Sequence, residues 1–172
     1  MEHREIAKQI YRRAQLKGEF TLRSGAKATE YFDKYRFESD PVLLRAIAEA
    51  LVPLVPRDVD ALAGVELGGV PIATVLSQLT GLPAFFVRKE AKKYGTCQLA
   101  EGGEIDGLRL AIVEDVVTTG GQLLESIREL RKRGAHVAHA LTVIDRGQSG
   151  PAQLAAVDVE LRALFSLDDL RT

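Results

Sequence analysis

The sequence is poor in residues that support redox chemistry or cysteine-based metal binding. Cys97 is the only cysteine among the 172 residues, which excludes an intrachain disulfide and any metal site built from cysteines. Tryptophan is absent, and the three histidines, His3, His136 and His139, do not have the spacing of metal ligands. We therefore expect no dedicated metal site formed by protein side chains.

The sequence also lacks a large net charge and a long apolar run. Its formal net charge is −1, so no global field attracts it to nucleic acid or to a membrane. No apolar stretch is long enough to span a bilayer, and the N-terminal residues 1–5 are too charged for a signal peptide. The length suits one domain, residues 1–172. We expect a cytoplasmic protein without nucleic acid or membrane partners, which meets any anionic substrate with a local group of basic residues.

Alternating strands and helices are predicted from residue 60 onward. Apolar runs at 61–65, 84–87, 110–113, 137–144 and 157–165 predict strands, and helices are expected from residue 70 and after residue 121. This α/β pattern predicts a mainly parallel central sheet flanked by helices on both faces, with ligands at the carboxyl ends of the strands.

The first part of the chain has a different pattern. Residues 2–16 predict a helix that ends at Gly18, and residues 20–25 and 29–37 predict two short strands. Asp40-Pro41 predicts the start of a further helix, because Asp is a favoured N-cap and Pro suits the first helical position. Residues 1–37 are therefore expected to form a small N-terminal hood segment on the main domain.

The residues with the clearest chemistry lie in the segment 110–126, LAIVEDVVTTGGQLLES. An apolar strand leads to Glu114 and Asp115, and a loop of small residues, 118–121, precedes a helix. The carboxylates can accept hydrogen bonds from ribose hydroxyls, while loop amides and the positive helix end can hold a phosphate. No Lys follows the glycines and no Gly-x-Gly-x-x-Gly is present, so this is not a Walker loop or a dinucleotide fingerprint. The segment predicts a sugar-phosphate site.

A basic run follows the strand predicted at 84–87. It contains Arg88, Lys89, Lys92 and Lys93, and the residues 90–106 have little hydrophobic periodicity. An isolated run of this kind is more often a solvated face. Here it follows a strand end near the predicted phosphate crevice, so we expect 90–106 to be a mobile loop that closes over the site and neutralises a diphosphate.

Several segments resemble one family. Residues 114–120, EDVVTTG, resemble the phosphoribosyl-diphosphate signature of the type I phosphoribosyltransferases, and residues 88–95, RKEAKKYG, look like the catalytic loop of orotate phosphoribosyltransferases. Further segments similar to that family are residues 20–25 with 31–33, residues 69–73 and residues 144–146. The resemblance implies the type I phosphoribosyltransferase fold, with a small N-terminal hood and a flexible catalytic loop. It also implies transfer of the 5-phosphoribosyl group from phosphoribosyl diphosphate to N1 of orotate, giving orotidine 5′-monophosphate and diphosphate in pyrimidine biosynthesis.

The resemblance also implies roles for the matching residues. Those expected to act in catalysis are Lys92, Arg88, Lys89 and Asp115. Those expected to bind phosphoribosyl diphosphate are Arg88, Lys89, Lys92, Glu114, Asp115, Val116, Val117, Thr118, Thr119, Gly120, Gly121 and Gln122. Those expected to bind orotate are Thr118, Arg146, Arg23, Tyr31 and Phe32.

In this scheme the acidic pair holds the ribose hydroxyls, directly or through magnesium-bound water, and either acid is equally placed to stabilise charge on the ribosyl ring. Mg²⁺ is expected to enter on the diphosphate substrate rather than in a protein cage. The family's loop reaches into the neighbouring subunit, which implies a homodimer in which Lys92 acts in trans. The sequence alone leaves action in cis or in trans open.

The chain departs from the family pattern at three positions. Tyr94 stands where many relatives have His, Gly68 where many have Lys, and Arg23 where Lys is common. Two other functions therefore stay open: transfer to another base, such as a purine or uracil, and a regulator that senses phosphoribosyl diphosphate without turnover. The retained Arg88-Lys89-x-x-Lys92 favours turnover.

Overall fold

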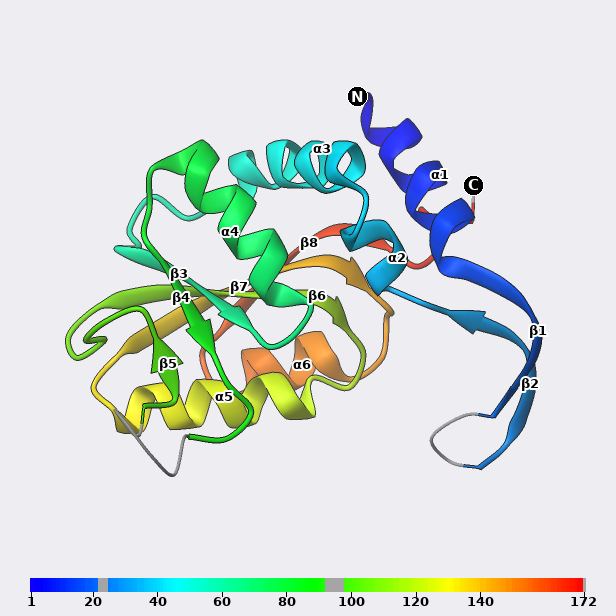
Figure 1. Cartoon of the computed structure of the whole chain (residues 1–172). Helices are drawn as coiled ribbons and strands as arrows, with labels where there is room; N and C mark the ends of the chain where they lie inside the picture. The colour runs from blue at the N-terminus through cyan, green and yellow to red at the C-terminus, as the bar shows by residue number, and fades with distance from the viewer. Residues whose placement is uncertain (22–24, 92–97, 172) are drawn as a thin grey trace.

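A six-stranded sheet forms the centre of the computed structural model, which describes residues 1–21, 25–91 and 98–171 (Figure 1). Its strands are β3 (Ala61–Val65), β4 (Ala84–Val87), β5 (Ala100–Glu101), β6 (Arg109–Val117), β7 (His136–Asp145) and β8 (Glu160–Ser166). They lie in the order β5-β4-β3-β6-β7-β8, and every neighbouring pair is parallel except β4 and β5. The predicted mainly parallel α/β sheet is confirmed.

Helices cover both faces of this sheet (Figure 1). On one side lie α1 (His3–Ala14), α2 (Tyr35–Glu38), α3 (Pro41–Leu51), a 3₁₀ turn (Val52–Leu54) and α4 (Gly69–Thr80). On the other lie α5 (Gly121–Lys132) and α6 (Gly150–Ala155). In the described part of the chain, no helix is both long and apolar enough to cross a membrane.

Strand β6 supplies side chains to the hydrophobic cores on both faces. Ala111 and Val113 join the core beneath α1, α3 and α4, while Leu110 and Ile112 join the core above α5 and α6. This alternation follows from the two-residue period of a strand, and it makes β6 apolar on both faces as a central parallel strand requires. The same alternation continues to the carboxyl end of the strand.

A hairpin of β1 (Gln15–Thr21) and β2 (Lys27–Phe32) forms a separate antiparallel sheet that extends away from the body (Figure 1). Helix α1, in contrast, buries Ile6 and Ile10 in the main core. The helix ends at Ala14 rather than near Gly18, because Gln15 already pairs with Phe32 of the hairpin. Strand pairing therefore overrides the glycine stop signal.

The predicted strand over residues 29–37 is correct only as far as Phe32. Asp33 then turns the chain, since its carboxylate oxygen accepts a hydrogen bond from the Tyr35 amide at 3.2 Å and its carbonyl accepts one from the Arg36 amide at 3.3 Å. Such Asx turns compete with strand structure. The short helix α2 follows at once and moves Tyr35 to Glu38 out of the hairpin.

The remaining predictions agree in type and differ mainly in extent. The strands at 61–65 and 84–87 have the predicted ends, and the Asp40 carboxylate accepts hydrogen bonds from the Val42 and Leu43 amides as an N-cap. β6 continues past the apolar run to Val117, because Val117 still pairs with Asp145 of β7. Neither β5, which lies inside the predicted mobile loop, nor α6 is predicted by the sequence.

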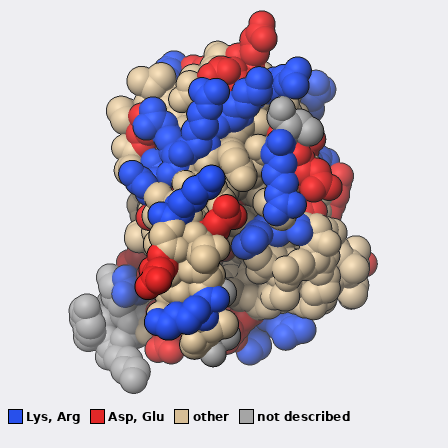
Figure 2. Space-filling model, turned by 90° about the vertical axis from the view of Figure 1, so that its right-hand side faces the viewer, with Lys and Arg blue, Asp and Glu red and all other residues tan. Residues whose placement is uncertain are grey.

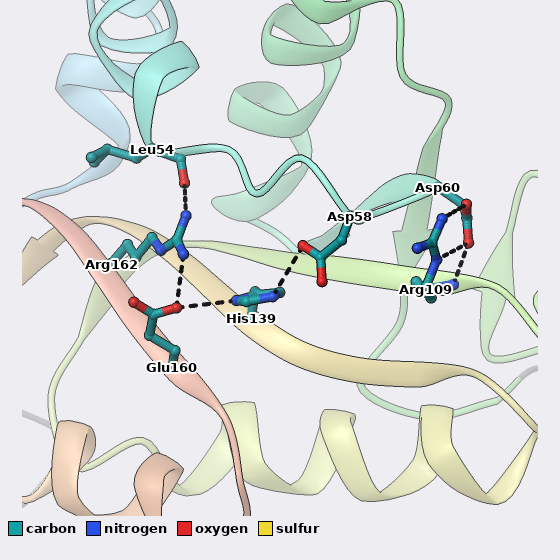
Figure 3. A network of polar contacts seen from close by, with 7 residues as sticks. All are labelled: Leu54, Asp58, Asp60, Arg109, His139, Glu160 and Arg162. Atoms are coloured by element: carbon teal, nitrogen blue, oxygen red, sulfur yellow. Dashed lines mark hydrogen bonds and ion pairs between the residues drawn. The ribbon is translucent and has the colours of Figure 1, made fainter.

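Polar contacts join the amino ends of the strands, opposite the edge at which the parallel strands end (Figure 3). Arg109 binds Asp60 through two side-chain nitrogens, at 2.7 and 3.0 Å, and through its backbone amide at 2.8 Å. His139 lies 3.3 Å from a Glu160 oxygen and 3.4 Å from an Asp58 oxygen. Since these contacts connect β3 with β6 and β7 with β8, they hold the register of the sheet.

Replacing Asp60 by Asn should remove an acid-sensitive part of the stability. Hydrogen bonds from Arg109 lower the pKa of Asp60 to about 2. The ionised carboxylate therefore stabilises the folded protein fully at pH values above the usual pKa of Asp, and this contribution is lost as the pH falls toward 2. Thermal melts between pH 2 and 7 should show a lower Tm for Asp60→Asn at neutral pH and a difference that shrinks toward pH 2. Asp168→Asn, on the exposed C-terminal turn, is the matched control. A constant difference at every pH would contradict this role.

Candidate active site

One cavity of about 530 Å³ lies at the carboxyl ends of β6 and β7. Figure 1 shows these strand ends on the same side as α2 and the base of the hairpin. Its lining residues are Tyr31, Phe32, Lys34, Tyr35, Glu114, Val116, Val117, Thr118, Thr119, Gly120, Gly121, Gln122, Leu123 and Arg146. The carboxyl edge of a parallel sheet is where such folds bind ligands, so this cavity is the candidate site.

One part of the cavity lining is built to hold an anion. Gly120 has a left-handed φ of +78° and starts α5 with no side-chain cap, so the first amides of this helix have no intrahelical partner. The Thr118 carbonyl oxygen accepts a hydrogen bond from the Gly150 amide at 3.2 Å. The two segments are so close that a side-chain carbon added at Gly150 would lie 2.7 Å from this oxygen. The loop is thus held against α6 with its free amides toward the cavity, an arrangement that suits a phosphate.

The cavity lining also combines aromatic rings with a guanidinium. Tyr31 and Phe32 come from the end of β2, Tyr35 from α2, and Arg146 from the residue after β7. The Tyr31 ring also lies 5.6 Å from the Phe20 ring across the hairpin. Aromatic faces beside a forked cation are suited to a planar ring that carries a carboxylate.

The two adjacent acids point to opposite sides of β6. Glu114 lines the cavity, whereas Asp115 is fully buried on the α2 and α4 side. The Asp115 carboxylate is bound by Lys34 Nζ at 2.9 Å from Oδ1 and 2.8 Å from Oδ2, and Oδ1 also accepts the Val116 amide. The sequence placed both acids at the ribose hydroxyls. In the structure Glu114 lines the cavity, and Asp115 lies behind Lys34.

A third acid, Glu38 at the end of α2, is packed against Asp115. Burial, together with a hydrogen bond to Asp115, raises the pKa of Glu38 to about 9. Burial and the nearby Asp115 charge raise the pKa of Glu114 well above its usual range. Burial opposes the charge on Lys34, but the attraction of Asp115 outweighs it and raises the pKa of Lys34. The cluster therefore favours a charged Lys34–Asp115 pair and shifts both glutamic acids toward their protonated forms.

The pair Gly68 and Gly69 allows α4 to pack closely against the end of β6. A side-chain carbon at Gly68 would lie 1.7 Å from Asp115 Oδ2, and one at Gly69 would lie 2.1 Å from the Val113 carbonyl oxygen. Residue 68 therefore has no room for the lysine that many relatives carry. In this chain the described cations that border the main cavity are Lys34 and Arg146.

The described cations of the basic run, Arg88 and Lys89, lie beside this cavity rather than inside it. The Lys89 amide donates to the Glu66 carboxylate, and the Arg88 amide donates to the Leu99 carbonyl at 2.9 Å. Lys89 borders a neighbouring hollow of about 350 Å³ that shares Gln122 with the main cavity. Within the described residues, neither Arg88 nor Lys89 lines the main cavity. Arg23 and Lys92, which were assigned to orotate and to diphosphate, lie outside the described residues.

Surface charge is uneven on the side that carries these strand ends. Figure 2 shows Lys and Arg side chains spread over this face, most densely at its upper end, with acidic side chains between them. Helix α1, at the top of the molecule in Figure 1, supplies Arg4, Lys8, Arg12 and Arg13. The small net charge of the chain thus conceals local basic surfaces.

Sequence reasoning missed Lys34, Tyr35 and Glu38. Lys34 and Tyr35 were assigned to an extended strand over residues 29–37, in which their side chains would alternate along the hairpin rather than converge on β6, and Glu38 lies just beyond that range. The one available signal was Asp33, whose side chain favours turns and helix starts. Leu123, a buried residue of α5, also lines the cavity.

The phosphoribosyl transferase domain family matches residues 39–161 of this chain. This match agrees with the three-layer fold and the anion loop, and together they define a phosphoribosyltransferase. An orotate phosphoribosyltransferase from a Nocardioides species is 53% identical over 155 residues, which cover 90% of this chain and 87% of the relative. The chain belongs to the orotate phosphoribosyltransferase family.

Solved structures support the same assignment. The orotate phosphoribosyltransferase of Mycobacterium tuberculosis H37Rv, in complex with Fe(III) dicitrate, has a TM-score of 0.88 and 32% identity over 99% of each chain. The same enzyme in complex with 5-phospho-α-D-ribosyl 1-diphosphate has a TM-score of 0.84 and 29% identity over 99% of each chain. The predicted type I phosphoribosyltransferase fold is confirmed.

Replacing Gly68 by Ala should destabilise the protein by about 1–3 kcal/mol, the usual cost of overpacking a filled interior. The added methyl would displace the Asp115 carboxylate and disturb its pair with Lys34. Urea unfolding measures the loss. Gly121→Ala is the control, because its methyl would meet only Thr119 Oγ1 at 3.9 Å. Equal stability of the two variants would show that the Gly68 contact is easily relieved.

Proposed function

We propose that this chain transfers the 5-phosphoribosyl group from phosphoribosyl diphosphate to N1 of orotate, forming orotidine 5′-monophosphate and diphosphate. The observation that carries the proposal is a cavity whose lining combines an uncapped helix start, a carboxyl group, and aromatic rings with Arg146. Family membership supports it, as does the similar Mycobacterium tuberculosis enzyme that binds phosphoribosyl diphosphate.

The cavity residues divide between the parts of the two substrates. The amides of the loop from Val117 to Gly121 hold the 5-phosphate, and Glu114 accepts hydrogen bonds from ribose hydroxyls. Arg146 binds the orotate carboxylate, with Tyr31 and Phe32 beside the ring and Thr118 at its edge. The N1 electron pair forms the new bond to the ribose C1, the C1–oxygen bond breaks with its electron pair leaving on the diphosphate, and the N1 proton is released to the diphosphate or to water.

Basic residues after β4 neutralise the leaving diphosphate. Arg88 and Lys89 are held beside the Glu66 loop next to the cavity, and Lys92 is the principal cation of the predicted closing loop. Neutralising the diphosphate stabilises charge that develops as the bond breaks. We further propose a homodimer in which Lys92 enters the partner's site.

Magnesium is expected to arrive on the diphosphate and ribose hydroxyls of the substrate. The described residues contain no group of three or more His, Cys, Asp or Glu arranged to hold a metal. Mg²⁺ usually keeps several of its waters and binds through substrate phosphates with one or two carboxylates, which supports its entry on the substrate. When bound, the ion would offset the charge of the diphosphate.

The competing functions differ in the residues that they require around the bound nucleobase. A phosphoribosyltransferase for a purine or uracil needs no cation for a ring carboxylate, whereas Arg146 and three aromatic residues border the cavity. A regulator would bind phosphoribosyl diphosphate without turnover. The charge arrangement therefore favours an acidic pyrimidine and catalysis.

Orotate consumption, followed by ultraviolet absorbance with phosphoribosyl diphosphate and magnesium, tests the proposal. We expect magnesium-dependent loss of orotate and no turnover of adenine, guanine, hypoxanthine or uracil. Turnover of another base would keep the phosphoribosyl site and overturn the role of Arg146. Binding of phosphoribosyl diphosphate without turnover of any base would favour the regulator.

The Lys92→Ala variant tests the loop assignment. We expect kcat to fall by about a hundredfold or more, because a cation on the leaving group acts mainly in the transition state. The Tm should stay close to that of the unmodified protein. Lys132→Ala, an exposed residue paired with Glu129 on α5, is the matched control. Unchanged turnover in Lys92→Ala would remove this residue from the mechanism.

A further inference from the structure

Lys34 has no role in the scheme above, although its side chain lines the cavity. It precedes α2, and Phe37 of this short helix is fully buried in the main core. The backbone that carries Lys34 is therefore anchored to the body and not only to the hairpin. An ammonium on an anchored segment is well placed to bind an anion in the cavity.

The Lys34 ammonium is fixed from behind by a single carboxylate. Its Nζ lies 2.9 Å from Asp115 Oδ1 and 2.8 Å from Oδ2, and 5.4 Å from the centre of the Tyr35 ring. About a third of the Lys34 side chain remains exposed, whereas Asp115 is fully buried. An ammonium has three N–H donors, so the Asp115 contacts leave donor capacity for a ligand on the cavity side.

Asp115 is itself supported by Glu38. Glu38 is more than nine-tenths buried, and its Oε1 has no donor among the described residues. This oxygen and Asp115 Oδ2 both approach the point where a side-chain carbon of Gly68 would lie, at 2.9 and 1.7 Å. Two carboxyl groups packed into one dry site favour a proton on one of them, because each ionised carboxylate can only accept.

The position of this cluster indicates which substrate Lys34 meets. Asp115 Oδ2 abuts Gly68, which begins α4 next to Glu66, and the Glu66 carboxylate accepts the Lys89 amide. Lys34 thus shares the cavity with Glu114, and its partner Asp115 lies against the start of α4, close in the chain to the residue that binds the Lys89 amide. Orotate, in contrast, has Arg146 for its carboxylate.

We propose that Lys34 binds the ribose-diphosphate part of phosphoribosyl diphosphate, and that Asp115 and Glu38 are positioning residues that hold its ammonium at the cavity wall. The inference rests on the proposed function for the identity of the ligand. It assigns Asp115 the additional task of orienting a cation that faces the cavity. It also explains how a site with three acids accepts a polyanion, since the protonated Glu38 adds no negative charge.

Calorimetric titration of the whole protein with phosphoribosyl diphosphate and magnesium, without any base, tests this inference. We expect Lys34→Met to raise the Kd by about tenfold or more, the effect of losing a charge-assisted hydrogen bond. Kinetic assays should show the same rise in KM for phosphoribosyl diphosphate and little change in KM for orotate. Lys132→Met, which removes an exposed lysine paired with Glu129, is the control.

Two substitutions of Glu38 separate positioning from general stability. Glu38→Gln keeps an N–H donor toward Asp115 and should bind phosphoribosyl diphosphate with a Kd within about threefold of the unmodified protein. Glu38→Leu fills similar space without a donor and should raise the Kd by about fivefold or more. Glu49→Gln, on the exposed face of α3 beside Arg45, controls for the amide substitution itself. The Tm of each variant is measured alongside.

An unchanged Kd in Lys34→Met, or a rise confined to the KM for orotate, would overturn the inference. Equal Kd values for Glu38→Gln and Glu38→Leu would remove Glu38 from it, and if Glu38→Leu does not fold, the Lys34→Met result alone decides. If the unmodified protein binds phosphoribosyl diphosphate but consumes no orotate, the proposed function fails while the Kd comparison still stands. If it does not bind phosphoribosyl diphosphate at all, both fail.

Discussion

The structure depends on one constraint, the burial of β6 on both faces. Because side chains alternate along a strand, Ala111 and Val113 serve one core while Leu110 and Ile112 serve the other. The same alternation sends Glu114 into the cavity and Asp115 into the layer beneath α2 and α4. A buried carboxylate needs a partner, and this need connects the strand end to the rest of the site.

Lys34 meets that need and thereby joins the hood to the sheet. It comes from the segment between the hairpin and α3, about eighty positions before Asp115 in the chain. The start of α4 cannot supply this partner, because any side chain at residue 68 would clash with the Asp115 carboxylate. The packing of α4, the position of α2 and the charge of the cavity are therefore parts of one arrangement.

Much of the fold could be predicted because its signals are local. The apolar runs at β3 and β4, the Asp40 cap and the helix after Gly121 all have the predicted type and nearly the predicted ends. The failures lie where tertiary pairing competes with local signals. Gln15 joins the hairpin before Gly18 can end α1, and Asp33 ends β2 early. The site prediction has the same pattern. The loop 118–121 could be recognised from a contiguous motif, whereas the position of Lys34 at the cavity could be found only from the tertiary structure.

By itself, the sequence determined the α/β class, the anion loop before α5, the acidic pair and the family resemblance, because each is a contiguous run whose residues act through local geometry. Only the tertiary structure decided that Glu114 and Asp115 have different surroundings, that Glu38 is buried against Asp115, and that Lys34 borders the cavity. These contacts join α2, α4 and β6, which are distant in the chain. Their energetics depend on burial and on the nearest opposite charge, and both are properties of packing.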